Sequence, residues 1–188
     1  MRAIIPVAGI GSRLKPHTNT IPKVLLTVGD KPILGHILQK LLDSGIKEAT
    51  FVTGHLGGMI KQYVEKNFPE MDSIFVEQKK QEGLGHAIYQ AAHTFGNDEI
   101  FIILGDTIFD VDLDAVIALG ANALGLKYVD DPKRFGVAII ENGKIKQLVE
   151  KPEVPPSNMA IVGLYYIKNS QKLAECLRSN IENNRRTR

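Results

Sequence analysis

The sequence AIIPVAGIGSRL, residues 3–14, decides the fold class of this chain. Its first five residues are largely apolar and predict a buried β-strand. Gly9 and Gly11 follow and predict a turn in which the backbone can approach a ligand closely, with the fixed charge of Arg13 beside it. The turn is not a dinucleotide-binding fingerprint, because Leu14 stands where the third glycine is required, and the chain contains no Walker motif. A ligand-binding loop and a plain tight turn therefore both remain open.

Beyond this strand, apolar runs alternate with amphipathic stretches. Further strands are predicted at 49–53, 73–76 and 100–104, and helices at 33–42, 59–68 and 84–95. This alternation predicts a largely parallel sheet with helices on both faces. Farther along, Asn142 and Gly143 are a strong hairpin signal between strands predicted at 136–140 and 145–149. A strand at 159–167 and a closing helix at 170–181 complete the predicted domain.

Composition limits the class of protein. The chain has 188 residues, 44% of them hydrophobic and 23% charged, and a formal net charge of +2. These values predict one globular domain with no global field for nucleic acid or an anionic membrane. No stretch approaches the ~20 apolar residues of a membrane span. The single cysteine, Cys176, excludes an internal disulfide and suits a reducing compartment, so a cytoplasmic protein with a buried Cys176 is expected.

Positive charge is concentrated just after the glycine turn. Between residues 13 and 31 the charges are Arg13, Lys15, Lys23 and Lys31 against Asp30. Such a local excess suits phosphate groups, which loop amides and cations bind together. Arg13 and Lys23 would neutralise the charge that develops as a phosphoanhydride bond breaks. A solvated basic loop is the alternative.

Asp106 is the second candidate anchor. It follows the apolar run 101–104, so its carboxylate is expected at the carboxyl edge of the sheet, where ligands of open α/β folds bind. A hard cation that bridges phosphates needs an oxygen ligand of this kind. Capping of the next helix is the alternative, but Asp112 lies closer to that helix.

Several motifs occur in an order that resembles the signature of sugar-1-phosphate nucleotidyltransferases. They are IPVAGIGSRL at 5–14, PK at 22–23, KPI at 31–33, QKKQEGLGHA at 78–87, LGD at 104–106, FGV at 135–137, EKP at 150–152 and PSNMAIVG at 156–163. The segment 78–87 resembles the base-reading segment of the uridylyl and thymidylyl branch, and 156–163 is similar to bacterial UTP:glucose-1-phosphate uridylyltransferases. The resemblance implies a Rossmann-like, three-layer αβα fold with a mixed, mostly parallel central sheet.

The resemblance also implies that residues 1–188 are one catalytic domain, cut short at its C-terminus. Members of the family usually continue with a further strand and helices. These would complete the sugar pocket and supply a second metal carboxylate beyond residues 183–188.

Nucleotide binding is implied for two segments that match the family. In the first loop the matching residues are Ala8, Gly9, Gly11, Ser12 and Arg13. In the second, Gln78 and Gly83 are implied to read the base. Uracil and thymine present an N3 donor between two carbonyl acceptors, and an amide carries both a donor and an acceptor. A helix cap is an equally simple explanation for Gly83.

On the sugar side, the resemblance implies binding by Gly136, Glu150, Lys151 and Ile161. The Glu150 carboxylate would accept a hydrogen bond from a sugar hydroxyl, and Lys151 would hold the sugar phosphate. A surface ion pair between Glu150 and Lys151 is the alternative. Ile161 stands where N-acetylglucosamine-1-phosphate uridylyltransferases have an asparagine, which disfavours the N-acetyl sugar.

The implied reaction is in-line attack of a sugar 1-phosphate, glucose 1-phosphate being favoured, on the α-phosphorus of UTP or dTTP. The catalytic residues would be Arg13 near the leaving pyrophosphate, Lys23 near the α-phosphate and Asp106 holding Mg²⁺. No side-chain nucleophile is needed, and His86 and His93 lack metal-ligand spacing. A homo-oligomer is compatible with the family. The alternatives are an N-acetylglucosamine-1-phosphate uridylyltransferase and a regulatory subunit that binds nucleotide sugars without catalysis.

Overall fold

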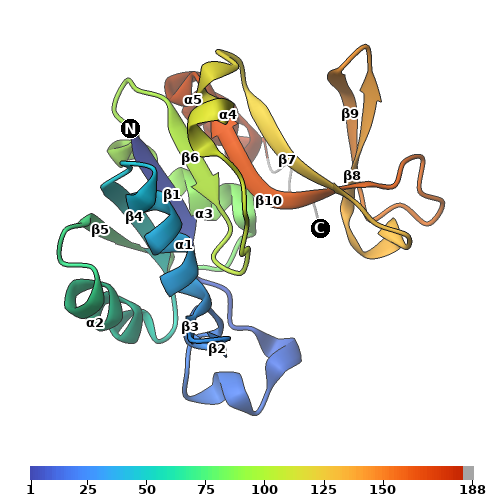
Figure 1. Cartoon of the computed structure of the whole chain (residues 1–188). Helices are drawn as coiled ribbons and strands as arrows, with labels where there is room; N and C mark the ends of the chain where they lie inside the picture. Colours follow the sequence, from blue (N-terminus) through green and yellow to red (C-terminus); the bar gives the residue numbers. More distant parts are fainter. Residues whose placement is uncertain (184–188) are drawn as a thin grey trace.

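The computed structural model describes residues 1–183 and consists of a central β-sheet with helices on both faces (Figure 1). The strands of the sheet are β1 (Arg2–Pro6), β4 (Glu48–Thr53), β5 (Asp72–Glu77), β6 (Ile100–Ile103), β7 (Ala123–Tyr128), β8 (Gly136–Glu141), β9 (Lys144–Glu150) and β10 (Met159–Ile167). The helices are α1 (Ile33–Asp43), α2 (Gly57–Asn67), α3 (Leu84–Gln90), α4 (Leu113–Ala118) and α5 (Ser170–Glu182). A two-stranded ribbon of β2 (Thr27–Val28) and β3 (Lys31–Pro32) stands outside the sheet.

The sheet is mixed, with the order β5-β4-β1-β6-β10-β8-β9, and β7 pairs with β10. Strands β5, β4, β1 and β6 run parallel. Strand β10 runs antiparallel to β6, β7 and β8, and β8 pairs antiparallel with β9. The α/β class and the mixed sheet are confirmed. Antiparallel pairing forms a larger part of the sheet than the strand and helix alternation alone predicts, because every strand after β6 joins in this way.

Two apolar clusters fill the spaces between the layers. On one face α1, α2 and α4 pack their buried side chains, such as Leu38, Val64 and Leu113, against the sheet. On the other face the cluster includes Ile88 of α3 and partly buried Leu177 of α5. Both faces of the parallel strands are therefore covered, which explains why β6 is apolar and buried at every position.

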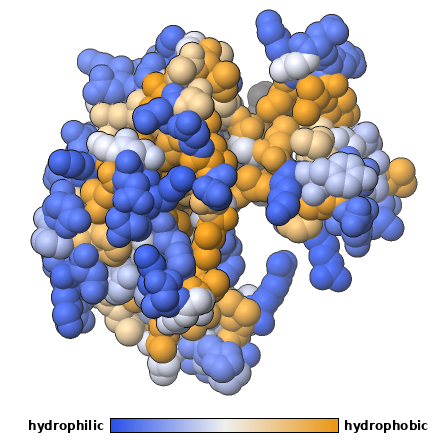
Figure 2. Space-filling model, viewed as in Figure 1, coloured by the Kyte–Doolittle hydropathy of each residue, from blue (hydrophilic) through white to orange (hydrophobic). Residues whose placement is uncertain are grey.

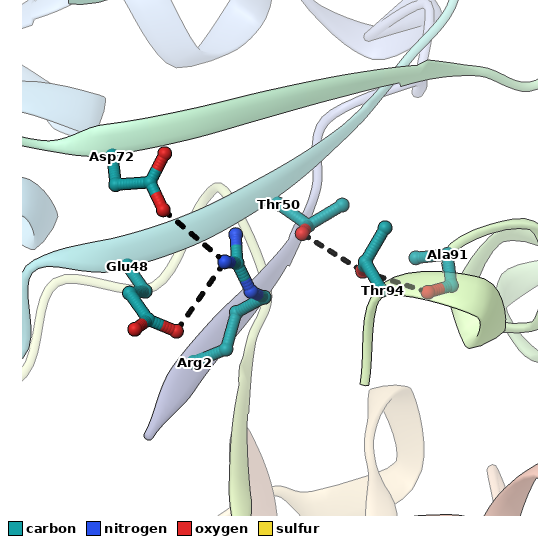
Figure 3. A network of polar contacts seen from close by, with 6 residues as sticks. All are labelled: Arg2, Glu48, Thr50, Asp72, Ala91 and Thr94. Atoms are coloured by element: carbon teal, nitrogen blue, oxygen red, sulfur yellow. Dashed lines mark hydrogen bonds and ion pairs between the residues drawn. The ribbon is translucent and has the colours of Figure 1, made fainter. Parts of the chain in front are cut away.

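The amino edge of the parallel strands is joined by charged side chains (Figure 3). The register places Arg2 beside Glu48 and Glu48 beside Asp72 on three neighbouring strands. One guanidinium nitrogen of Arg2 lies 3.3 Å from a carboxylate oxygen of each acidic residue. Nearby, the Thr50 hydroxyl donates to the Thr94 hydroxyl oxygen at 2.9 Å, and the Thr94 hydroxyl donates to the Ala91 carbonyl at 2.8 Å. These contacts fix the edge of the sheet that lies opposite the predicted ligand loops.

Most predicted elements are present, with three corrections. Strand β7 and the short ribbon of β2 and β3 were not predicted from the sequence. The predicted helix 84–95 ends at Gln90, and a short 3-10 helix, Ala92–Thr94, follows it. Cys176 is exposed on α5, so the expectation that it is buried was wrong.

The hairpin between β8 and β9 is confirmed. Asn142 and Gly143 both have positive φ, 52° and 72°, as its two-residue turn requires. No helix within residues 1–183 is long and apolar enough to cross a membrane.

Candidate functional site

A cavity of about 420 Å³ lies at the carboxyl edge of the parallel strands. It is bordered by the ends of β1 and β6, by Lys23 and Val24, and by residues from the segment 78–87. Strands β1 and β6 are parallel neighbours, so the loops that follow them meet at this edge. The chain thus brings the glycine loop, a lysine and an aspartate together, as the sequence predicts.

Lys23 and Asp106 form an ion pair at the mouth of the cavity. Lys23 begins a short 3-10 helix, Lys23–Leu25, and Asp106 lies just beyond β6. The two side chains are about one third and one half exposed, at 32% and 45%. The pair therefore remains open to solvent, where an entering anion or cation can compete for either partner.

Gly105 makes this close approach of β1 and β6 possible. Its amide donates to the carbonyl of Pro6 at 3.3 Å. A Cβ atom at position 105 would lie 2.5 Å from a methyl group of Val7 and 2.9 Å from one of Val24. A larger residue would thus push apart the two segments that carry Lys23 and Asp106.

Gln78 is buried beside the cavity and is fixed by two groups of the next segment. Its amide nitrogen donates to the carbonyl oxygen of Gly83 at 3.2 Å and lies 3.0 Å from Nδ1 of His86. Gln78 is 6% exposed as a whole residue. Gly83 is the N-cap of α3 and has φ +94°, so the cap explanation holds for this glycine at the same time as it borders the cavity.

Gln81 is a lining residue that the sequence did not single out. Its amide donates to the carbonyl oxygen of Ala8 at 3.0 Å, across 73 positions of the chain. This bond ties the base-side segment to the first loop. The signal that could have found it is its position in the same motif, three residues after Gln78.

The residues of the first loop differ in whether they border the cavity. Ala8 and Gly9 border the cavity. Gly11 has φ +66°, and its carbonyl accepts a 2.9 Å hydrogen bond from the Thr18 hydroxyl. Ser12 and Arg13 form an exposed 3-10 turn and do not line the cavity, and Arg13 makes no ion pair with another residue of 1–183. Their predicted roles in binding and catalysis stay predictions.

The predicted sugar-side residues gather at the hairpin. Gly136 of β8 is paired in register with Glu150 of β9. A Cβ at Gly136 would lie 2.9 Å from a Glu150 carboxylate oxygen and 3.1 Å from Ile161 of β10, so these three residues are neighbours. Lys151 follows with φ +41°, and its amide donates to the Phe135 carbonyl at 3.1 Å.

Glu150 and Lys151 also form the surface ion pair that is the alternative interpretation of these two residues. Nζ of Lys151 lies 2.9 Å from Oε1 of Glu150, and about half of each side chain is exposed. Burial raises the pKa of Tyr165, and the nearby negative charge of Glu150 raises that pKa further. Figure 2 shows an indentation between the part of the molecule that carries the β8–β9 hairpin and the main body of the protein.

A divalent cation at this site would rest on one protein carboxylate. Within residues 1–183 no three His, Cys, Asp or Glu side chains gather as a metal-binding group. Mg²⁺ commonly keeps several waters and uses one or two carboxylates together with substrate phosphates. The half-exposed carboxylate of Asp106 fits that kind of site. The second carboxylate that the sequence resemblance implies lies outside the described residues.

Residues 2–187 match the profile of one family, described as nucleotidyl transferase. The chain belongs to the nucleotidyl transferase family. It is 32% identical to a UTP–glucose-1-phosphate uridylyltransferase of Staphylococcus saprophyticus, over 89% of this chain and 71% of that protein. It is thus an enzyme of the sugar-1-phosphate nucleotidyltransferase family.

Solved structures of this family superpose closely. A UDP-glucose pyrophosphorylase complexed with UDP-glucose has a TM-score of 0.82 and 28% identity, covering 94% of this chain and 78% of that one. A Bacillus anthracis protein provisionally named a glucose-1-phosphate thymidylyltransferase has a TM-score of 0.84 and 34% identity, covering 93% and 73%. The Rossmann-like αβα arrangement is confirmed by these similarities.

Proposed function

We propose that this nucleotidyltransferase transfers a uridylyl or thymidylyl group from UTP or dTTP to glucose 1-phosphate. The observation that carries the proposal is the buried amide of Gln78 at the edge of the cavity. Both hydrogens of its nitrogen are directed at Gly83 and His86, so the oxygen is the atom left to meet a base. A carbonyl oxygen accepts the N3–H of uracil or thymine.

Lys23 and Asp106 supply the phosphate chemistry. The phosphate oxygen of the sugar attacks the α-phosphorus, the new P–O bond forms, and the bond to the β-phosphate breaks with loss of pyrophosphate. The attacking phosphate is already ionised, so the residues need only position two anions and neutralise them. A triphosphate entering the cavity offers Lys23 a new anionic partner and releases the Asp106 carboxylate.

Asp106 would then hold Mg²⁺, which supplies charge neutralisation on the phosphates when bound. Ala8 and Gly9 would carry the loop backbone to the triphosphate. Ser12 and Arg13 lie on the exposed continuation of the same loop, from where Arg13 would reach the leaving pyrophosphate.

The hairpin supplies the sugar side of the proposed site. Glu150 would accept a hydrogen bond from a sugar hydroxyl, and Lys151 would bind the sugar phosphate. Gly136 leaves room beside Glu150, because a side chain there would meet the carboxylate at 2.9 Å. Ile161 presents an apolar side chain at this point, which favours glucose 1-phosphate over its N-acetylated amino-sugar counterpart.

A substrate panel tests the proposal. Pyrophosphate release is measured with Mg²⁺ for UTP, dTTP, CTP and GTP, each with glucose 1-phosphate and with N-acetylglucosamine 1-phosphate. We expect the highest kcat/KM for UTP or dTTP with glucose 1-phosphate. Faster turnover of N-acetylglucosamine 1-phosphate would support the alternative enzyme. Calorimetric binding of UTP with no product from any pair would support the regulatory-subunit alternative.

A further inference from the structure

The histidine that contacts Gln78 has no role in the phosphate chemistry. His86 lies in the first turns of α3, and its side chain is 15% exposed. Its Nδ1 lies 3.0 Å from the Gln78 amide nitrogen, and its Nε2 faces Glu82 and Gln90. A neutral histidine has one donor and one acceptor nitrogen, so its tautomer depends on these neighbours.

The carbonyl of Gly83 and the Nδ1 atom of His86 together set the orientation of the Gln78 amide. A carbonyl oxygen only accepts, so the nitrogen of the amide has to face it. Gln78 borders the cavity, and its amide oxygen is then the polar atom left for a nucleotide. The same nitrogen then donates its second hydrogen to His86 Nδ1. Nδ1 is therefore the acceptor, and the ring proton of neutral His86 lies on Nε2. The Gln90 amide can present its oxygen to this proton by exchanging its two ends.

We infer that His86 is a positioning residue that selects the base: by accepting from Gln78, it holds the amide oxygen toward the nucleotide. This inference rests on the proposed function, because it assigns the base to the Gln78 side of the cavity. Uracil and thymine offer a hydrogen at N3, which the amide oxygen accepts. Cytosine has an acceptor at N3, so it meets the same oxygen as acceptor against acceptor.

The cost of this mismatch is large because the site is buried. Two acceptors facing each other away from water lose their hydrogen bonds without compensation. A turned amide would instead suit cytosine, but it would place the Gln78 oxygen against the Gly83 carbonyl and the His86 Nδ1 lone pair. His86 and Gly83 thus act together against CTP.

Two substitutions separate positioning from packing. His86→Leu has a similar size and excludes water, but it removes the acceptor for Gln78. His86→Asn places an oxygen at the same number of bonds from Cα as Nδ1, so it restores the acceptor. His93→Leu is the matched control, because His93 is exposed on the adjacent 3-10 turn, where its Nδ1 lies 3.1 Å from the Gln90 carbonyl oxygen and away from Gln78.

The experiment measures dissociation constants of UTP and CTP by calorimetry and, separately, product formation. We expect His86→Leu to reduce the preference for UTP over CTP about 3- to 10-fold, the effect of one lost hydrogen bond. His86→Asn and His93→Leu should keep the wild-type preference. An unchanged preference in His86→Leu, with far-ultraviolet circular dichroism like the wild type, would overturn the inference.

If His86→Leu does not fold, His86→Asn decides. A preference in His86→Asn close to that of the wild type supports the inference, whereas a loss as large as that expected for His86→Leu contradicts it. The proposed function fails in a different measurement, namely absent product formation by the wild type. The binding ratio is obtained in either case.

Discussion

The cavity at the parallel strands and the hairpin of β8 and β9 hold the two halves of the proposed site in different ways. In the cavity, Gln78 is buried and Gly105 allows β1 and β6 to touch. At the hairpin, Glu150 and Lys151 are exposed and paired with each other. A buried, hydrogen-bonded group keeps one orientation, whereas an exposed ion pair contributes little and rearranges easily. The rigid cavity therefore suits selective recognition of one base. The exposed ion pair at the hairpin suits a ligand that binds reversibly by replacing the contact between Glu150 and Lys151.

Replacing Lys23 should have the largest effect, because it removes a charged group from the cavity part of the proposed site. Lys23→Ala removes the cation that pairs with Asp106 and that would neutralise the phosphates. We expect turnover to fall about 10²- to 10³-fold, as is common for one lost electrostatic contact in an active site. Steady-state pyrophosphate release measures this. Lys66→Ala, an exposed position on α2, is the control and should keep its activity. Near-normal turnover of Lys23→Ala would refute the role of Lys23.

Substitutions at Gly105 and Gly136 test whether the cavity is more rigid than the hairpin. Gly105→Ala would force a Cβ to 2.5 Å from Val7, inside the core, and we expect a loss of about 1–3 kcal/mol of unfolding free energy. Gly136→Ala would meet only the ends of the Glu150 and Ile161 side chains, which can move. Its loss should stay within about 1 kcal/mol. Urea denaturation of both variants gives the two values, and equal losses would contradict the comparison.

A change at Glu150 should have the smallest effect. It tests whether the hairpin binds the sugar phosphate substrate. Glu150→Gln keeps the shape and removes the charge that would assist a hydrogen bond from the sugar. We expect KM for glucose 1-phosphate to rise about tenfold, with KM for UTP unchanged, because a bond to a charged group is stronger than a neutral one. Initial rates at varied concentration of each substrate measure both constants. Glu153→Gln is the exposed control nearby. A rise in KM for UTP alone would contradict the assignment of Glu150 to the sugar side.

The sequence predicted those site residues whose position follows from a strand or a motif, and it missed those whose role depends on contacts between elements. Asp106 was found because it follows an apolar strand, and parallel strands bring their carboxyl ends to one edge. Gln78 was found through the resemblance of its segment to the base-reading motif of the family. Gln81 and His86 were missed as partners, because their contacts cross elements and depend on side-chain orientation. The burial predicted for Cys176 was wrong, because one residue type on a helix does not show which face meets the sheet.

The sequence by itself determined the alternation of strands and helices, the hairpin turn at Asn142 and Gly143, and the motifs that identify the family. These features are local, since periodicity and turn chemistry act over a few neighbouring residues. Only the tertiary structure decided that β10 joins the sheet antiparallel, that Lys23 pairs with Asp106 across the chain, and that the Gln81 amide bonds to the carbonyl of Ala8. The physical reason is that ion pairs and buried hydrogen bonds depend on distance and direction between segments far apart in the chain, which packing alone sets.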